Sequence, residues 1–249
     1  MSVDRAGALL RLNVALMMRE PGPALSRLVM PLVLITLTRP LYARALGGAA
    51  GTTQATAGML VMFSLLGMSV VGSAIMAERF WSTADRLRAS PARRWELLAG
   101  KALPVLVLLL AQQALIIGYG RLTFGLDIAA PMLVAGTVLV WGVTLLCIGA
   151  AIGIFARSGG ALSAMVDIGS LALTGLGGAF IPYAMLPAWA QAVAPVSPGY
   201  WAMRSLTGAL DGSTGRTLTA WAVLLGVAAI AAALAGRRLA TGWGRGLPG

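Results

Sequence analysis

Residues 78–101 read ERFWSTADRLRASPARRWELLAGK and separate two long hydrophobic runs. This 24-residue segment carries nine charged side chains, whereas the uncharged runs on either side extend over Ala45–Ala77 and Ala102–Gly120. Such a polar segment is stable only in water, while the flanking runs are apolar enough to enter a bilayer. The segment therefore predicts a membrane protein with a crowded polar loop that another molecule can contact.

The composition of the whole chain supports a membrane location. Of its 249 residues, 58% are hydrophobic and 11% are charged, whereas about a quarter of the residues of a soluble domain are charged. A helix needs about 20 apolar residues to cross the bilayer core. Five uncharged runs reach that length, at Ala45–Ala77, Ala102–Gly120, Ile128–Ala156, Ile168–Met203 and Thr217–Gly236. The first twenty residues lack the compact apolar core of a cleavable signal peptide.

A sixth span near the N-terminus depends on the distribution of basic residues. Only 11 uncharged residues, Leu28–Thr38, lie between Arg27 and Arg39. Cytoplasmic loops are enriched in Lys and Arg, and six spans with both termini inside place 14 basic residues inside and five outside. Five spans would place nine basic residues on one side of the membrane and ten on the other, which gives no orientation signal. We therefore expect a helix at Leu28–Tyr42, with Arg39 near its outer end reaching toward the lipid headgroups.

The sequence thus predicts an all-α membrane protein with one transmembrane domain over residues 1–249. An amphipathic helix at residues 1–22 is expected to lie on the inner leaflet. The expected spans cover residues 26–44, 58–77, 101–120, 130–156, 160–181 and 217–236. A short helix is expected at 78–90 on the cytoplasmic side, and a re-entrant helical hairpin at 182–210 between spans five and six.

Local signals give the polar segment its helical shape. Ser82 followed by Asp85 resembles a capping box, which favours a helix from about Thr83. Apolar and polar side chains then fall on neighbouring stripes, with Phe80 and Leu87 on the apolar one. The residues alone leave two readings open, an interfacial helix that floats on the headgroups and a helix that docks on a partner protein.

The sequence lacks the residues that several classes of function require. The sequence has no histidine and one cysteine, Cys147, so Ser-His catalysis, histidine metal ligation and a disulfide framework are excluded. Gly100-Lys101 lacks the remaining residues of a phosphate-binding loop. The net charge of +11 is spread over membrane-flanking loops without a nucleic-acid motif. We expect no catalytic residues, no metal, no bound cofactor and no nucleic-acid partner.

Two motifs resemble the type-2 ABC transporter permeases. The first is AERFWSTADRLRASPARRWELLAGK at residues 77–101, with its acidic-basic pair, Ser-Pro and Gly-Lys. The second is LTGLGGAFIPYAMLPAWAQAVAPVSPGYWAMRSLTGALDG at residues 173–212, with its glycines, Pro-x4-Pro-x-Trp, Ser-Pro and Arg. Together with six spans, the resemblance covers almost the whole chain. Among relatives it is most similar to the short drug-resistance permeases.

The resemblance implies a coupling helix seated on a separate ATP-binding subunit. Two such subunits and a second permease chain, identical or sibling, would complete the transporter, with ATP and Mg bound by the ATPase and none by this chain. The implied coupling residues are Glu78, Arg79, Trp81, Thr83, Asp85, Arg86, Leu87 and Arg88.

Small residues on span five form a second candidate site. Ser170, Thr174 and Gly178 are four residues apart, a spacing that lets membrane helices approach closely. The resemblance implies that this face and span one meet the second permease, so a dimer seam or translocation path is expected at Pro31, Ser170, Thr174, Gly177 and Gly178. Asp167, on the same span, is expected to be solvated rather than to pair with a substrate.

Prolines interrupt the segment after span five. They prevent one continuous helix, while Pro187 and Ser197-Pro198 can each begin a short one. Aromatic residues there suit the headgroup level. The resemblance places this hairpin over the exit, and its candidate residues are Pro182, Pro187, Trp189, Pro198 and Arg204.

The leading functional hypothesis is the permease subunit of an ATP-driven exporter for a hydrophobic or amphiphilic compound, such as a drug, antibiotic or lipid-like molecule. It would lie in the bacterial cytoplasmic membrane with both termini in the cytoplasm. A permease for a lipid-linked glycan is the alternative within the family. A membrane scaffold and an intramembrane enzyme are the alternatives from other classes.

Overall fold

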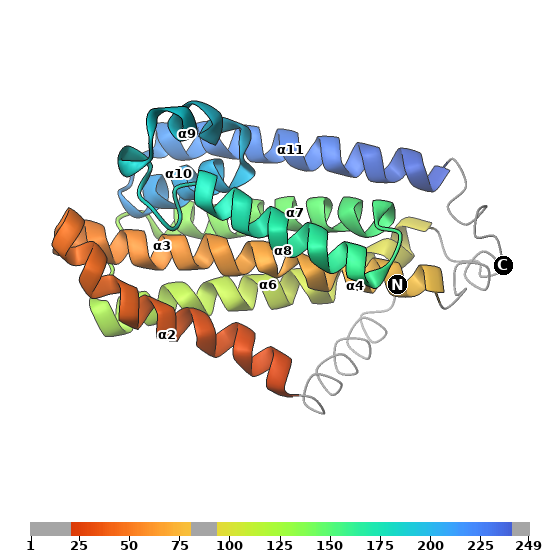
Figure 1. The fold of residues 1–249 in the computed structure, drawn as a ribbon, viewed down its shortest axis with the longest axis horizontal. Helices are drawn as coiled ribbons and strands as arrows, with labels where there is room; N and C mark the ends of the chain where they lie inside the picture. Colours follow the sequence, from red (N-terminus) through yellow and green to blue (C-terminus); the bar gives the residue numbers. More distant parts are fainter. Residues whose placement is uncertain (1–20, 81–93, 241–249) are drawn as a thin grey trace.

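The computed structural model describes residues 21–80 and 94–240, with side chains described over 28–76 and 103–238. Every regular element in these ranges is helical (Figure 1). The long helices are α2 (Pro21–Leu46), α3 (Gly48–Leu66), α4 (Met68–Phe80), α6 (Arg94–Phe124), α7 (Pro131–Phe155), α8 (Gly159–Leu176) and α11 (Thr214–Ala240). Between α8 and α11 lie η1 (Tyr183–Met185), α9 (Ala188–Val193), η2 (Ala194–Val196) and α10 (Pro198–Leu210).

Six helical spans are long and apolar enough to cross a membrane, which confirms the predicted fold class. The doubtful first span is Leu28–Leu46 within α2, although Pro31 and Pro40 lie inside that helix. The second span, Gly48–Met76, consists of α3 and α4, which meet at Gly67. The other four are Leu103–Phe124, Pro131–Phe155, Gly159–Leu176 and Thr214–Arg238. The expected N-terminal helix at 1–22 lies almost entirely outside the described residues.

Three spans differ in length from their expected ranges by four residues or more, and one of them, the sixth, extends past 217–236 at both ends as Thr214–Arg238. The second begins at Gly48, ten residues before position 58, because residues 51–57 are already largely buried and pack as helix. The fifth ends at Leu176 rather than 181. Gly178 has a φ of +77°, a left-handed conformation that ends a helix and that glycine adopts without strain. The chain therefore leaves α8 earlier than hydrophobicity alone indicates.

The core of the fold lies around α3, which contacts α2, α6, α8 and α10. Its continuation α4 contacts α7 and α8, while α11 packs on α7 and α10. The turn between α2 and α3, the end of α6 and the short helices α9 and α10 gather at one end of the bundle, on the left in Figure 1. The ends of α4 and α11 lie at the opposite end.

Small residues let α7 approach α4 closely. A Cβ on Gly149 would lie 2.8 Å from Cβ of Val71, and one on Gly153 would lie 2.7 Å from the carbonyl oxygen of Gly72. The Gly149 and Gly153 pair therefore serves contact within one chain, since small residues four positions apart let helices approach closely.

Buried polar side chains also connect the helices. Trp141 on α7 donates from Nε1 to Oγ of Ser64 on α3 at 2.7 Å, and both residues are buried. Trp221 on α11 donates to Oγ1 of Thr137 on α7 at 3.0 Å, and Thr137 is 2.9 Å from Oγ of Ser205 on α10. Since a polar group in hydrocarbon is costly unless paired, these bonds hold α7 in one register with its neighbours.

Candidate functional site

Prolines set the boundaries of the short helices that follow α8. Pro182 and Pro187 directly precede η1 and α9, and Pro198 is the first residue of α10. A proline at the first helical position loses no hydrogen bond, since that N–H has no partner within the helix. Ser197 caps α10 by accepting a hydrogen bond from the Gly199 N–H at 3.1 Å. The segment is therefore a compact helical hairpin, as the proline spacing predicts.

Aromatic residues cluster on this hairpin. The Tyr200 ring lies 5.2 Å from the Tyr183 ring and 5.3 Å from the Trp201 ring, measured between centroids. Arg204 donates from Nη1 to the Tyr200 hydroxyl at 3.4 Å. Trp189 is 68% exposed and projects from α9. The hairpin thus has one side where aromatic rings contact one another and another where Trp189 is exposed.

Side chains from α2 and α3 hold the start of the hairpin. Gln54 donates from Nε2 to the carbonyl oxygens of Gly178 and Ala179 at 2.8 and 3.3 Å. Tyr42 donates from its hydroxyl to the Phe180 carbonyl oxygen at 2.5 Å. Gly58 allows this approach, because a Cβ there would lie 2.2 Å from the carbonyl oxygen of Ala179. The chain leaving α8 is therefore fixed on the face of α3.

A second contact joins the end of α8 to the start of α10. A Cβ on Gly177 would lie 2.8 Å from the carbonyl carbon of Gly199, and one on Gly199 would lie 2.6 Å from the Leu173 carbonyl oxygen. Ser197 donates from Oγ to that same oxygen at 3.1 Å. Gly177 thus contributes to the base of the hairpin and is buried within the chain.

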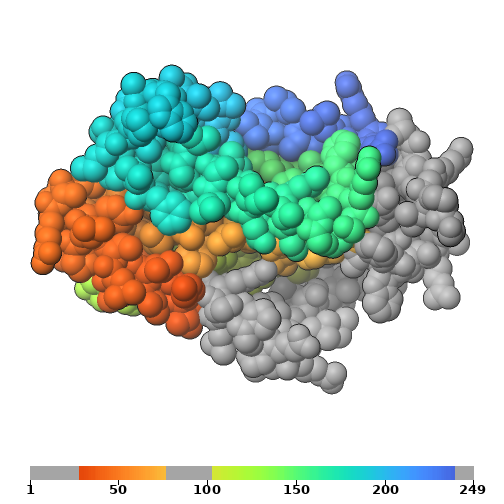
Figure 2. Space-filling view, viewed as in Figure 1, coloured from red at the N-terminus to blue at the C-terminus, as the bar shows by residue number. Residues whose placement is uncertain are grey.

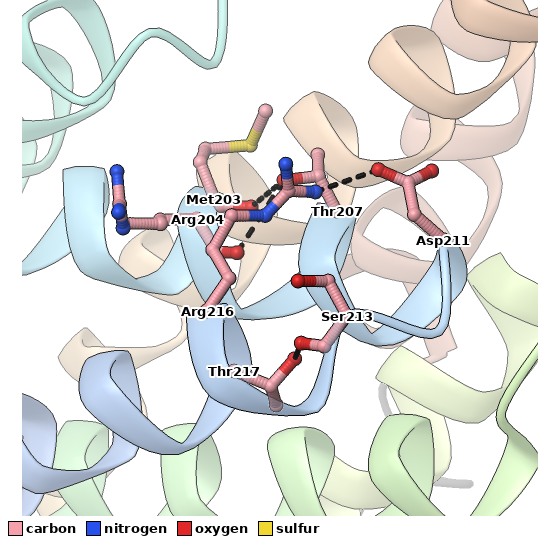
Figure 3. A network of polar contacts seen from close by, with 7 residues as sticks. All are labelled: Met203, Arg204, Thr207, Asp211, Ser213, Arg216 and Thr217. Atoms are coloured by element: carbon pink, nitrogen blue, oxygen red, sulfur yellow. Dashed lines mark hydrogen bonds and ion pairs between the residues drawn. The ribbon is translucent and has the colours of Figure 1, made fainter.

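The hairpin ends in a polar turn between α10 and α11 (Figure 3). Arg216 pairs with Asp211, with Nη2 2.6 Å from Oδ2. Thr217 donates to the Ser213 carbonyl oxygen at 2.9 Å. Gly208 leaves room for both side chains, because a Cβ there would lie 2.9 Å from Oγ1 of Thr217. This turn closes the hairpin onto the last span.

The small residues expected at a dimer seam lie inside the chain. Ser170 and Thr174 are 1% and 0% exposed, Gly178 is buried, and α8 packs there on α3 and α10. Pro31 on α2 is buried as well. Small side chains let helices pack most closely, and here the closest neighbours belong to the same chain. The exposed surfaces of α2 and α8 therefore consist of other residues.

Large apolar side chains are exposed on both α8 and α2. On α8, Met165, Ile168 and Leu171 are 51%, 70% and 61% exposed, and on α2, Leu37 and Leu41 are 68% and 65% exposed. In Figure 2, atoms of α3 and α4 are visible in a strip between α2 and α8. The two exposed faces therefore flank the central helices on one side of the molecule.

Asp167 lies on this exposed face of α8. It is eight residues after the start of the helix at Gly159, a depth of about 12 Å at 1.5 Å per residue. An isolated carboxylate facing lipid at that depth is expensive, and such residues usually face water or protein. The face around Asp167 is thus better suited to water or another chain than to lipid.

The polar segment between the second and third spans is described only at its edges. Glu78 and Arg79 belong to the last turn of α4, without described side chains. Trp81, Thr83, Asp85, Arg86, Leu87 and Arg88 lie outside the described residues, as does the rest of the expected helix at 81–90. The end of α4 and the beginning of α6 that flank this segment are at the end of the bundle opposite the hairpin.

The sequence was also compared with known proteins. The family model described as "ABC-2 type transporter" matches residues 5–210, which is more than four fifths of the chain. No curated protein matches the chain. The family match spans the polar segment, five of the six spans and the whole hairpin.

Proposed function

The chain belongs to the ABC-2 type transporter family and is a multi-pass permease, and on this premise we propose that it is the membrane subunit of an ATP-driven exporter. The single observation that carries the proposal is the family match over residues 5–210 on a bundle with six apolar spans. Members of this family generally work with ATP-binding cassette partners. ATP hydrolysis and its Mg then belong to the partner subunits.

Two permease chains form the path in this proposal. The surface made by the exposed faces of α2 and α8 contains Leu37, Leu41, Ile168 and Leu171, an apolar area that suits a second chain or an amphiphilic cargo. Asp167 lies among them and favours contact with water or protein over lipid. The strip of α3 and α4 between α2 and α8 would line the path, with Met62 and Ser73 on its half-buried or exposed face.

Residues 78–90 provide the coupling helix. In an exporter the two ATPase subunits close on ATP, and force must enter the permease where its polar loops meet them. The segment is charged, follows α4 directly and precedes α6. A push on it reaches α4, which packs on α7 and α8. The movement is thereby transmitted to the surface of α8 that faces the second chain.

The hairpin lies at the exit side in this proposal, with both chain termini in the cytoplasm. The distribution of basic residues along the sequence favours this orientation, since six spans with both termini inside leave 14 of the 19 in inside segments. The bonds of Gln54 and Tyr42 connect the hairpin to the helices that line the path. A hydrophobic or amphiphilic compound such as a drug or antibiotic is the proposed cargo.

Export of a lipid-linked glycan is a second candidate. The exposed apolar side chains of the hairpin favour it, because Trp189 and Val196 are 68% and 83% exposed where a lipid tail could pass. A glycan would need a wider polar path, whereas the described faces of α2 and α8 are predominantly apolar. We therefore place the amphiphilic compound first.

Drug-stimulated ATP hydrolysis tests the proposal. The chain is purified from its native membrane together with any ATP-binding cassette subunit that copurifies, and the complex is placed in lipid vesicles. Hydrolysis is then measured against a panel of hydrophobic amines, neutral amphiphiles and lipid-linked sugars. We expect a hydrophobic compound to raise turnover severalfold over the basal rate. Stimulation by lipid-linked sugars alone would favour the second candidate. Failure of the chain to copurify with any ATPase would contradict the transporter role and favour a scaffold.

A further inference from the structure

The Arg39 side chain lies in a pocket between α2, α3 and α6. Its Nε donates to Oγ1 of Thr52 at 3.2 Å, and its Cζ lies 5.7 Å from the centroid of the Phe124 ring. These contacts fix the plane of the guanidinium while leaving its terminal nitrogens without a hydrogen-bond partner among the described residues. The terminal nitrogens of this cation are therefore available to donate hydrogen bonds to an anion that enters the pocket.

The pocket has a volume of about 240 Å³ and is open on one side. We call it the Arg39 pocket; its lining residues are Arg39, Gly48, Ala49, Thr52, Thr53, Phe124, Gly125, Leu126 and Asp127. Asp127 is exposed and, within the described chain, forms no ion pair with Arg39 or with another residue. The two opposite charges thus face one cavity without neutralising each other.

The position of the pocket matches the depth of lipid headgroups. Arg39 lies about two turns before the end of α2 at Leu46. Phe124 is the last residue of α6, and Gly48 is the first residue of α3. All three helix ends lie at one end of the apolar bundle, where the hydrocarbon core gives way to phosphates.

We propose that the Arg39 pocket binds the headgroup of a zwitterionic phospholipid of the phosphoethanolamine type, with the phosphate at Arg39 and the ammonium at Asp127. A guanidinium binds phosphate oxygens through paired N–H donors, and a primary ammonium donates hydrogen bonds to a carboxylate. One ligand that carries both groups satisfies both unpaired charges. The inference requires only that the bundle lies in a bilayer and is independent of the transport role.

The same residues disfavour the other common headgroups. A choline headgroup has no N–H to donate, and quaternary ammonium ions bind against aromatic faces. Phe124 is the one aromatic ring among the lining residues, and the guanidinium of Arg39 already lies over it. A glycerol headgroup has no cation for Asp127. Selectivity for ethanolamine over choline and glycerol is thus a direct consequence of the site.

Native mass spectrometry with defined lipids tests this proposal. The purified full-length chain in detergent is titrated with short-chain phosphatidylethanolamine, phosphatidylcholine and phosphatidylglycerol, and the lipid retained per protein gives an apparent affinity. We expect one phosphatidylethanolamine to be retained about tenfold more tightly than either other lipid. Equal retention of the three lipids would overturn the proposal.

Two substitutions separate the roles of the charges. Arg39→Met should weaken phosphatidylethanolamine binding about tenfold or more, since a hydrogen-bonded charge pair is lost. Asp127→Asn, at an exposed position that does not challenge folding, should abolish the preference for ethanolamine over choline. Arg44→Met is the matched control, because Arg44 is exposed in the last turn of the same helix and does not line the pocket. If Arg44→Met lost as much affinity as Arg39→Met, the effect would be one of general surface charge, and the assignment of the headgroup to the Arg39 pocket would be wrong.

Soluble phosphoethanolamine distinguishes a lipid from an aqueous solute. The lipid should bind more tightly than the free headgroup, because its chains also contact the apolar flank of α2. If phosphoethanolamine displaces the lipid at equal concentration, the occupant is a solute and the lipid assignment is wrong.

Discussion

Gln54 on α3 donates a hydrogen bond from Nε2 to the carbonyl oxygen of Gly178, at 2.8 Å, across 124 positions of sequence. Gln54 is 8% exposed, so the bond is shielded from water. Tyr42 makes the neighbouring bond to Phe180. The segment that leads from α8 into the hairpin is thus held by donors from the first two spans, and motion of these spans is expected to carry the hairpin with them.

Replacing Gln54 by leucine should loosen the start of the hairpin. The substitution removes the donor and leaves the carbonyl oxygens of Gly178 and Ala179 unpaired, at a cost of about 1–3 kcal/mol. We expect a lower midpoint temperature of unfolding in detergent and faster amide hydrogen exchange over residues 177–187. An unchanged exchange rate in this segment would contradict the role assigned to Gln54.

Gln191→Leu is the matched control for that experiment. Gln191 also donates from Nε2 to a carbonyl oxygen, that of Leu186 at 2.8 Å, but both residues belong to the hairpin. Its loss should speed exchange around α9 without affecting residues 177–180.

Gly58→Ala should destabilise the fold by about 1–3 kcal/mol, since overpacking forces the backbone apart. The added Cβ would lie 2.2 Å from the Ala179 carbonyl oxygen, which is main chain and cannot rotate away. Thermal unfolding of the purified protein measures the loss. Gly118→Ala on α6 provides the control, because no atom lies within 4 Å of its added Cβ. That control should be neutral or more stable by up to about 1 kcal/mol from helix propensity. Equal unfolding stability of the two variants would contradict the close approach of Gly58 to the Ala179 carbonyl oxygen.

The number and type of spans could be predicted because they follow from local properties. Hydrophobic run length gave five spans, and the asymmetry of basic residues added the one between Arg27 and Arg39. The hairpin helices followed from Pro187 and Pro198, since proline fixes where a helix can begin. These signals depend on near neighbours in sequence and need no knowledge of tertiary contacts.

The direction of individual side chains could not be predicted in the same way. Arg39 was expected near the outer end of its span, but its contacts with Thr52 and Phe124 could not be foreseen, because they depend on α3 and α6 offering an acceptor and a ring there. Likewise, the spacing of Ser170 and Thr174 indicated a helix contact but not its partner, which is α3 of the same chain. Which helix a small-residue face contacts depends on how the helices assemble, and sequence periodicity does not indicate this.

Thr137→Val should weaken the contact among α7, α10 and α11. The valine has nearly the same shape but removes the acceptor for the half-buried Trp221 and the bond to the buried Ser205, leaving both side chains without these partners. A loss of about 1–3 kcal/mol in unfolding free energy is expected. Thr219→Val is the comparison, since its hydroxyl bonds only to the Gly215 carbonyl of its own helix and is exposed. A loss as large in Thr219→Val would show that the interhelical bonds contribute nothing specific.

Charge reversal at Arg79 or Arg86 tests the proposed coupling helix. Placing glutamate at either position should weaken binding of the ATPase subunit or separate hydrolysis from transport, because like charges would meet at the contact. Copurification yield and substrate-stimulated hydrolysis are the measurements. Arg44→Glu, at the opposite end of the bundle, should retain both activities. Normal transport-linked hydrolysis in both coupling variants would refute their role.

Cysteine labelling decides which end of the bundle faces the cytoplasm. In a Cys147→Ala background, which removes the single native thiol, cysteines are introduced at Ala192 and Ser158, both exposed. Ala192 lies on α9 of the hairpin, while Ser158 precedes α8 at the other end of that span. A membrane-impermeant maleimide should label position 192 in intact cells and position 158 only after permeabilisation. The reverse pattern would place the charged segment after α4 outside the cell, where no ATPase could act on it.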